Sequence, residues 1–375
     1  MDWEVLARLP KAAVRRRGRF IVADLIEDHR VISTSAINGG EVESLRHLVN
    51  HQCCEGKDHN DRFHLIVARG DEFYHETVCA EIGLPPVRTA MMATAANMNY
   101  AACAAKRDAD VEVLAIVTAG VETNAVCAGD PASSRETSEG VVSAIPVGTI
   151  NTILLSNMPL MRGALARTVI TMAEAKSAAL QRLAVPSCYS TDLATGTGTD
   201  QYCVAAPLEG MRTLKSASPH MKFGEIVGLA VRDATLEALR WQNGLEASYT
   251  RGLFRALGRY GIKESTIYDR LAPLLEAESL ELLRKNNASV FYEPLVGAAA
   301  HATAAVLDRA RFGTLPPSLL RDAIVQQAAS LAASLAAKPD RWPEFRARLH
   351  ATPVAEPVEL IVHAIALGWS EKWKA

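Results

Sequence analysis

The sequence TGTGTDQYCVAAPLEGMRTLKSASPHMKFGE, residues 195–225, sets the organisation that we predict for the chain. It begins with alternating Gly and Thr residues that end at Asp200, and a short apolar segment, Tyr202 to Ala206, follows. A polar loop then leads to His220 and Lys222, where a long amphipathic segment starts. Because backbone amides, hydroxyls and ionisable groups together form many binding sites, we expect a strand, a loop and a helix start to build a functional site here.

Short apolar runs bounded by turn residues predict the other strands. The clearest is VEVLAIVTAG (111–120), which is β-branched, apolar and ended by Gly. The full set of predicted strands lies near residues 20–36, 62–68, 111–119, 149–156 and 201–206. The first of them is predicted to be a β-hairpin with a charged turn at Glu27–Arg30. Residues 89–107, rich in Ala and Met, are predicted to form a buried helix or a strand–helix join, and 131–140 a surface loop.

Amphipathic periodicity predicts helices over 163–183 and 221–244, and a short helix ended by Pro85–Pro86. The fold class is therefore α/β (or α+β), a layered sheet with flanking helices and the site at the strand ends. Beyond residue 246 only amphipathic segments with Pro-containing breaks follow. We predict an α/β domain over 1–245 and an all-helical C-terminal extension over 246–375, which serves packing or oligomerisation in a homo-oligomer.

Composition narrows the class of protein. Of the 375 residues 49% are hydrophobic, and the formal net charge is −2. Binding to nucleic acid or to a membrane surface needs a net basic face, so we expect neither partner. Cys53 and Cys54 are adjacent, and the other five of the seven cysteines are scattered along the chain. This spacing does not predict a set of structural disulfide bonds. The first residues lack the apolar run of a signal peptide, and we expect a soluble, cytoplasmic protein that binds a small molecule.

One lysine stands out on the helix predicted over 163–183. Its apolar face contains Leu165, Met172 and Leu180, and Lys176 falls in the centre of that face. An ammonium group on an apolar face either extends to solvent or meets an anion, because burying it alone is costly. Lys176 is therefore either part of a structural ion pair or a functional lysine.

Residues 45–64 contain a concentration of histidine and cysteine. The spacing of His51, Cys53, Cys54, His59 and His64 suggests zinc, but the paired CxxC and HxxxH patterns of strong zinc sites are missing. We assign no metal ligand. A divalent metal held by His51, His59 or His64 remains an alternative.

Seven stretches in the same order resemble the adenosylcobinamide amidohydrolase family. They are STSAINGG (33–40), NHQ (50–52), TAGVETNAVCAGD (118–130), GTINTILL (148–155), ALARTVITMAEAKSAAL (164–180), ATGTGTDQYCVA (194–205) and HMKFGEIVGLAV (220–231). The resemblance covers roughly residues 20 to 240. The segment around 53–64 and the helical C-terminal third depart from the family pattern.

The resemblance implies hydrolysis of adenosylcobinamide to adenosylcobyric acid and aminopropanol, with the corrinoid as substrate and no certain cofactor. The bond cut is the amide that joins a corrin-ring propionate to the aminopropanol arm. Two alternatives stay open. One is a related hydrolase that acts on another amide or on a metal-chelating small molecule, with a metal as cofactor. The other is a non-catalytic corrinoid-binding protein.

Amide hydrolysis needs an activated water or nucleophile, a proton donor for the leaving amine and hydrogen-bond donors to the oxyanion. We predict Glu225 or Asp200 as the general base, His220 or Lys222 as the general acid, and Lys176 as electrostatic support. Substrate binding is predicted for the hydroxyl, amide and imidazole side chains in the family-like segments. These are Asn38, Asn50, His51, Asn124, Thr149, Asn151, Thr197 and Thr199. Asp130 is interpreted as a turn residue, and Cys127 as a buried thiol rather than a nucleophile.

Overall fold

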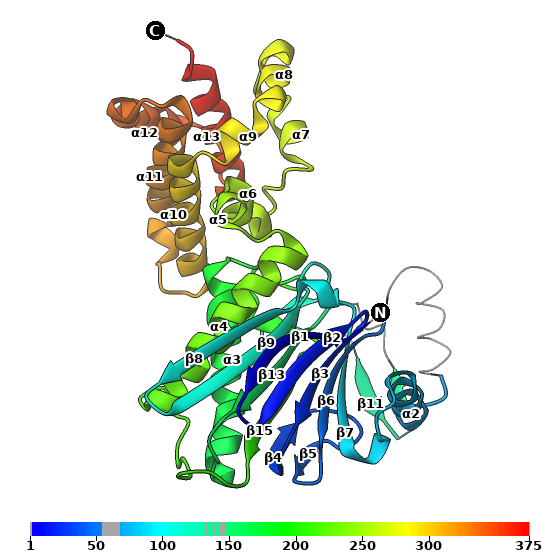
Figure 1. Ribbon diagram of the computed structural model, residues 1–375. Helices are drawn as coiled ribbons and strands as arrows, with labels where there is room; N and C mark the ends of the chain where they lie inside the picture. Colours follow the sequence, from blue (N-terminus) through cyan, green and yellow to red (C-terminus); the bar gives the residue numbers. More distant parts are fainter. Residues whose placement is uncertain (1, 55–67, 133, 139, 143–147, 375) are drawn as a thin grey trace. The chain divides into compact units, whose positions relative to one another are not determined.

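The computed structural model describes residues 2–54, 68–132, 134–138, 140–142 and 148–374 (Figure 1). The chain forms two compact units, Met1–Leu245 and Glu246–Ala375.

A five-stranded sheet is formed by the described residues of the first unit, in the order β1-β2-β3-β6-β7. Its strands are β1 (Glu4–Leu9), β2 (Ala12–Arg17), β3 (Phe20–Leu25), β6 (His47–Gln52) and β7 (Thr89–Thr94). Neighbouring strands are antiparallel except β6 and β7, which are parallel.

The second sheet of this unit has six strands within the described residues, in the order β5-β4-β15-β13-β9-β8. They are β4 (His29–Ser33), β5 (Gly40–Val42), β8 (Ala102–Asp108), β9 (Val111–Ala119), β13 (Ile150–Ser156) and β15 (Gln201–Pro207). Strands β13 and β15 are parallel, and β9 runs antiparallel to β13. The start of β13, the start of β15 and the end of β9 therefore lie at the same edge of the sheet.

The sheets pack face to face, and helices cover both outer faces. One core lies between the sheets, and it includes Ile21 and Met92 from the first sheet and Ile116 and Ile153 from the second. A second core joins the six-stranded sheet to helices α3 (Arg162–Arg182) and α4 (Lys222–Asn243). A third joins the five-stranded sheet to α2 (Asp71–Ile82). The ribbon shows the resulting order helix, sheet, sheet, helix (Figure 1).

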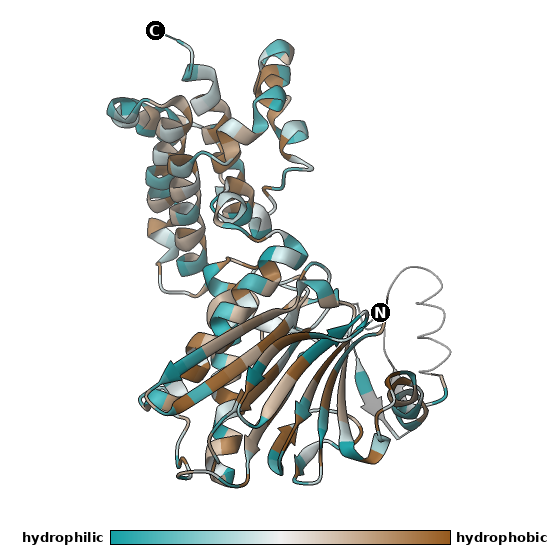
Figure 2. Cartoon of the chain, viewed as in Figure 1, coloured by the Kyte–Doolittle hydropathy of each residue, from teal (hydrophilic) through white to brown (hydrophobic). Residues whose placement is uncertain are grey.

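The layering explains why the central strands are apolar throughout. Side chains alternate between the two faces of a strand. In β9 Val113 and Val117 point to the helices, while Leu114 and Ile116 point to the other sheet. Both faces are buried, so both sets of side chains are apolar (Figure 2).

Two short strand pairs lie at the loops. Strand β10 (Ala125–Val126) pairs with β14 (Gly196–Thr197), and β11 (Arg135–Thr137) pairs with β12 (Gly140–Val142). The β10–β14 pair fastens the loop after β9 to the loop before β15. The segment 131–140, predicted to be a loop, thus contributes to a hairpin.

The predicted fold class is confirmed, as are the strands near 111–119, 149–156 and 201–206 and the helices over 163–183 and 221–244. The predicted hairpin over 20–36 is wrong, because β3 and β4 belong to different sheets and only three residues connect them. The predicted helix within 89–107 is also wrong. This segment forms β7, the 3₁₀ turn Met98–Tyr100 and β8. Of the strand predicted over 62–68, residues 62–67 lie outside the described residues.

The second unit is helical, as predicted. Its helices are α5 (Ala247–Thr250), α6 (Leu253–Leu257), η3 (Gly258–Tyr260), α7 (Ile267–Leu271), α8 (Ala277–Lys285), α9 (Asn287–Phe291), α10 (Pro294–Arg311), α11 (Pro317–Ala336), η4 (Pro339–Arg341), α12 (Trp342–Ala351) and α13 (Pro357–Glu371). Its core includes Phe291, Leu331, Ile361 and Trp369. Gly368 lets α13 approach α11, since a Cβ there would lie 2.6 Å from the carbonyl oxygen of Ala332. Among the described residues, no helix has the length and apolar character that a membrane crossing needs.

Candidate functional site

The candidate site lies at the edge of the six-stranded sheet where β9 ends and where β13 and β15 begin. The loops at 120–130, 148–149 and 198–200 meet there, since each adjoins one of these three strand ends. Such strand ends are common places for binding sites in layered α/β proteins.

A buried ion pair fixes the loop before β15. The carboxylate of Asp200 accepts hydrogen bonds from the backbone N–H of Ile150 (2.9 Å), and from the backbone N–H (3.0 Å) and the hydroxyl (2.5 Å) of Thr197. It also accepts one from the ammonium group of Lys176. The side chains of Lys176 and Asp200 are only 9% and 8% exposed. The lysine on the apolar face of α3 therefore has its anion, from a residue 24 positions later in the chain.

The ion pair keeps Lys176 charged. Burial by itself would lower the pKa of Lys176, but the charge and hydrogen-bond interactions with Asp200 and Tyr202 together raise that pKa above its ordinary value. At neutral pH the ammonium group cannot act as a base. Gly196 is required beside the pair, since a Cβ there would overlap the carboxylate of Asp200 and the ammonium of Lys176.

Asn124 joins the three loops. Its buried amide nitrogen donates to the carbonyl of Gly148 (2.8 Å), and its amide oxygen accepts from the hydroxyl of Tyr189 (3.1 Å). The backbone carbonyl of Asn124 accepts from the N–H of Gly198 (3.3 Å). Thr199 donates to the same Gly148 carbonyl (2.9 Å). The structure thus brings Asn124, Thr199, Thr197, Asp200 and Lys176 together, along with Thr149, whose hydroxyl donates to the Thr199 carbonyl (2.5 Å).

A cavity of about 340 Å³ opens beside Asn124. It is lined by Asn124, Val126, Cys127, Ala128, Gly129, Asp130, Pro131, Ala132, Ser134, Tyr189 and Gly198. These residues come from three separate parts of the chain. We call this the Asn124 cavity.

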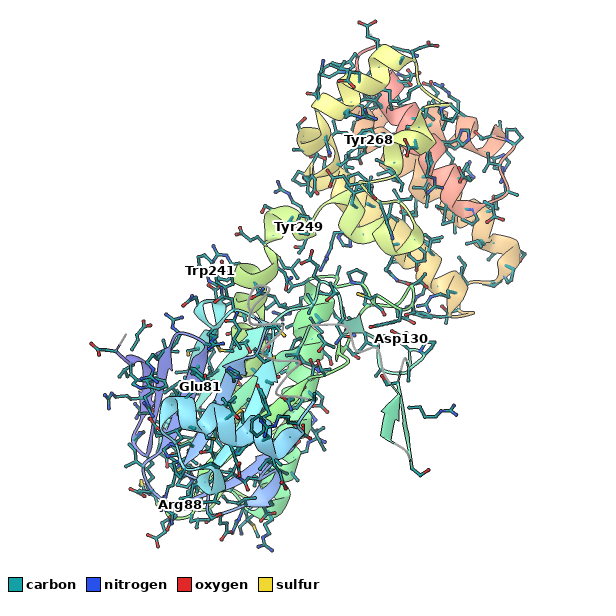
Figure 3. All side chains as sticks on the ribbon, turned by 90° about the vertical axis from the view of Figure 1, so that its right-hand side faces the viewer. Glu81, Arg88, Asp130, Trp241, Tyr249 and Tyr268 are labelled. Atoms are coloured by element: carbon teal, nitrogen blue, oxygen red, sulfur yellow. The ribbon has the colours of Figure 1, made fainter. Side chains whose placement is uncertain are left out.

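Asp130 is the carboxylate among the described residues that line the Asn124 cavity. Its N–H donates to the carbonyl of Cys127 (2.9 Å), which closes a turn as the sequence predicted. Its carboxylate also accepts from the N–H of Cys127 (2.8 Å) and the hydroxyl of Ser187 (2.6 Å). Figure 3 labels Asp130 on the loop that leads to β11. The turn role was recognisable in the sequence, but the place of Asp130 in a cavity wall was not, and nothing in the pattern marked Tyr189 either.

Asn50 and Asn151 lie between the two sheets rather than in the Asn124 cavity. The amide of Asn151 donates to the side-chain oxygen of Asn50 (2.9 Å) and to the carbonyl of Ala93 (3.0 Å). Asn50 in turn donates to the hydroxyl of Thr118 (2.8 Å). All three of these polar side chains are buried. They connect β6 to β9 and β13, so these side chains link the two sheets by hydrogen bonds.

His51 and Asn38 are placed on the five-stranded sheet and its loops. Nδ1 of His51 lies 2.6 Å from the hydroxyl of Tyr74, and its ring stacks on Phe20 with centroids 4.9 Å apart. Asn38 donates to the carbonyls of Pro86 and Thr89 (2.9 and 2.8 Å). The predicted substrate-binding role of these two residues therefore finds no counterpart in the Asn124 cavity. His59 and His64 lie outside the described residues, and within the described part no three His, Cys, Asp or Glu side chains gather as metal ligands would.

His220, Lys222 and Glu225 lie at the other end of the sheet. They follow the end of β15 and are exposed, and Lys222 donates to Glu225 (2.8 Å) across one turn of α4. The seven residues of β15 separate them from Asp200 by about 23 Å of extended chain. Our prediction that they share one site with Asp200 is wrong. Proximity in sequence was misleading because a strand spans the full sheet in between.

The adjacent thiols of Cys53 and Cys54 lie 3.8 Å apart and behave differently. A hydrogen bond from Cys53 lowers the pKa of Cys54 to about 7, whereas the pKa of Cys53 is raised, first by this hydrogen bond and then by burial.

Since the thiolate is the reactive form, we expect iodoacetamide to alkylate Cys54 at neutral pH, at a rate that rises with pH up to about pH 8. Peptide mass mapping measures this. Buried Cys79 and Cys203, with pKa values of about 11, are the internal controls. Replacing Cys53 by Ala should slow the reaction at pH 7, and an unchanged rate would contradict the hydrogen bond.

Comparisons with known proteins agree with the resemblance found in the sequence. The family described as adenosylcobinamide amidohydrolase matches residues 6–247. An uncharacterized protein of Methanocaldococcus jannaschii is 33% identical over 184 residues, which are 46% of this chain and 71% of that protein. The match to a crystal structure of a Pyrococcus horikoshii protein covers 63% of this chain and 82% of the chain of that protein, with 12% identity and a TM-score of 0.31. That likeness is too low to show a common fold.

Proposed function

Because the chain belongs to the adenosylcobinamide amidohydrolase family, we propose that it hydrolyses adenosylcobinamide to adenosylcobyric acid and aminopropanol. The family match ends at residue 247, so it falls on the unit that contains the Asn124 cavity. The observation that carries the proposal is the convergence at this cavity. Segments 118–130 and 194–205, both part of the family resemblance, form its wall together with Tyr189.

The size of the Asn124 cavity decides which part of the substrate enters. A corrinoid is far larger than 340 Å³, so the cavity takes the amide-bearing arm while the ring stays at the mouth. Val126, Ala128 and Pro131 give the wall apolar surface, and the ring of Tyr189 adds an aromatic face. Such a lining with a few fixed polar groups is typical of small-molecule sites.

In the proposed reaction Asp130 takes a proton from water. The water oxygen forms a bond to the amide carbon, the C–N bond breaks, and the leaving nitrogen takes up the proton that Asp130 removed from water. Two hydrogen bonds, from Ser187 and from the N–H of Cys127, hold the Asp130 carboxylate in place for this step. The hydrogen bonds of Asn124 and the Lys176–Asp200 ion pair act indirectly. They fix Tyr189 and Gly198 in the cavity wall, so that these groups are already in place before the reaction.

Turnover by the full chain tests the proposal. We expect incubation with adenosylcobinamide to yield adenosylcobyric acid and aminopropanol in equal amounts, detected by mass spectrometry. The reaction should need the protein and stop on heat denaturation. Tight corrinoid binding without either product would contradict the proposal and favour a binding protein. Hydrolysis of simpler amides with no action on the corrinoid would favour a related hydrolase of other specificity.

A further inference from the structure

A second, smaller cavity of about 130 Å³ is lined by Thr123 and Gly148, which neighbour Asn124 in the chain and in space. Gly148 lines the smaller cavity, and its carbonyl oxygen accepts the hydrogen bond from Asn124 Nδ2 at 2.8 Å. Asn124 in turn lines the larger one. This hydrogen bond links a wall residue of one cavity to a wall residue of the other. A substrate whose scissile bond lies beside this contact would have one part in each cavity.

The smaller cavity favours a positive charge. Glu122, an exposed carboxylate, lines it, and no Lys or Arg is among its described lining residues. Gln242 and Asn243, the last residues of α4, also line it. The C-terminal end of a helix carries a partial negative charge, which attracts cations. The charge of Glu122 and the dipole of α4 thus act in the same direction.

The polar groups in the wall have defined orientations. The side-chain oxygen of Gln242 accepts from the N–H of Asn97 (2.9 Å), and that of Asn243 accepts from the N–H of Val121 (3.2 Å). With both oxygens engaged, the NH₂ groups are the ends of these amides that remain to donate to a ligand. The cavity therefore combines a carboxylate with amide donors. A small molecule with an ammonium group and a hydroxyl oxygen complements that set.

We propose that this cavity is the subsite for the small amino alcohol that amide hydrolysis releases, with Glu122 binding its ammonium group. The inference rests on the proposed function. When water adds to the carbonyl carbon and the C–N bond breaks, the products at neutral pH are a carboxylate and a protonated amine. A three-carbon amino alcohol fits within 130 Å³, while a corrin ring does not. The acid product then stays in the Asn124 cavity and the amine in the smaller one.

The stage of the reaction at which the nitrogen becomes positively charged predicts which kinetic constants depend on Glu122. The amide nitrogen of the substrate is neutral, and positive charge develops on it only as the C–N bond breaks. Glu122→Gln should therefore lower kcat and weaken inhibition by the amine product while KM stays near its wild-type value. Because Glu122 is solvent-exposed, we expect changes of about threefold to fivefold, which shrink as salt is added.

The test uses 1-aminopropan-2-ol as probe with the full chain. Its binding to the wild-type protein is measured by calorimetry, and its inhibition constant is measured in the turnover assay. Propan-2-ol, which lacks the amine, should bind no more than weakly. Glu209→Gln is the matched control, since Glu209 is an exposed carboxylate of the same unit that lines neither cavity. We expect weaker binding of the amine to the Glu122 variant and unchanged binding to the Glu209 variant.

Equal binding of 1-aminopropan-2-ol to the wild type and to Glu122→Gln would overturn the subsite, even if the protein hydrolyses adenosylcobinamide. Binding that depends on Glu122 in a protein that does not turn over adenosylcobinamide would keep the subsite and remove the proposed function. The two failures are thus distinguishable, because one is measured by binding of the amine alone and the other by product formation.

Discussion

Replacing Asp200 by Asn is expected to lower the free energy of unfolding of the first unit by about 3–5 kcal/mol, because it leaves the ammonium of Lys176 buried without its anion. Lys176→Met should cost a similar amount, since it leaves the Asp200 carboxylate without its cation. The double variant carries no unpaired charge. It should lose only about 1–2 kcal/mol, from weakened hydrogen bonds to Asp200. Urea unfolding followed by circular dichroism measures all three.

The exposed pair Lys222–Glu225 is the matched control for this prediction. Its side chains are 66% and 47% exposed, so Glu225→Gln should leave the unfolding midpoint unchanged. The single and double variants at Lys176 and Asp200 form a double-mutant cycle. If the effects of the single variants simply add in the double variant, the two groups do not depend on each other and our account of the ion pair is wrong.

Asp130→Asn is expected to lower kcat for adenosylcobinamide hydrolysis by about a hundredfold or more, the usual effect of removing a general base. Asn can still accept the hydrogen bonds from Ser187 and from the N–H of Cys127, so the fold should be retained. The measurement is the initial rate of cobyric acid formation at saturating substrate, with circular dichroism as the check on folding.

Two variants make the test of Asp130 specific. Glu225→Gln changes a carboxylate at the opposite end of the sheet and should retain full activity. Cys127→Ala removes a thiol from the cavity wall and should also stay active if water is the nucleophile. Loss of activity in the Cys127 variant with full activity in Asp130→Asn would replace the proposed water mechanism by a thiol nucleophile.

The fold was predictable where local pattern alone decides the structure. An apolar run such as 111–119 is long enough for a strand buried on both faces, and the periodicity of 163–183 is that of a helix. Pairing partners were not predictable, because periodicity does not show which strand lies beside which. This is why β3 and β4 were predicted to form a hairpin. In β7, Ala90 and Met92 face the other sheet while Met91 faces α2. That two-residue alternation was obscured because Ala and Met, the residues that form it, also favour helices.

The site was predictable only in part, for a related reason. The position of Lys176 on an apolar face showed that it needed an anion or solvent, and Asp200 supplies the anion. The identity of that partner depends on how α3 packs beside the start of β15, which no local pattern contains. Tyr189 and Glu122 carry no sequence signal of their own. They become candidates only when the cavities are seen.

A crystal structure of the full chain with adenosylcobyric acid tests the central claim most directly. We predict that the free carboxylate of the product arm lies in the Asn124 cavity, within hydrogen-bonding distance of groups on the 124–130 loop, with the corrin ring at its mouth. A product bound beside Lys222 and Glu225, at the far end of β15, would contradict the assignment of the site.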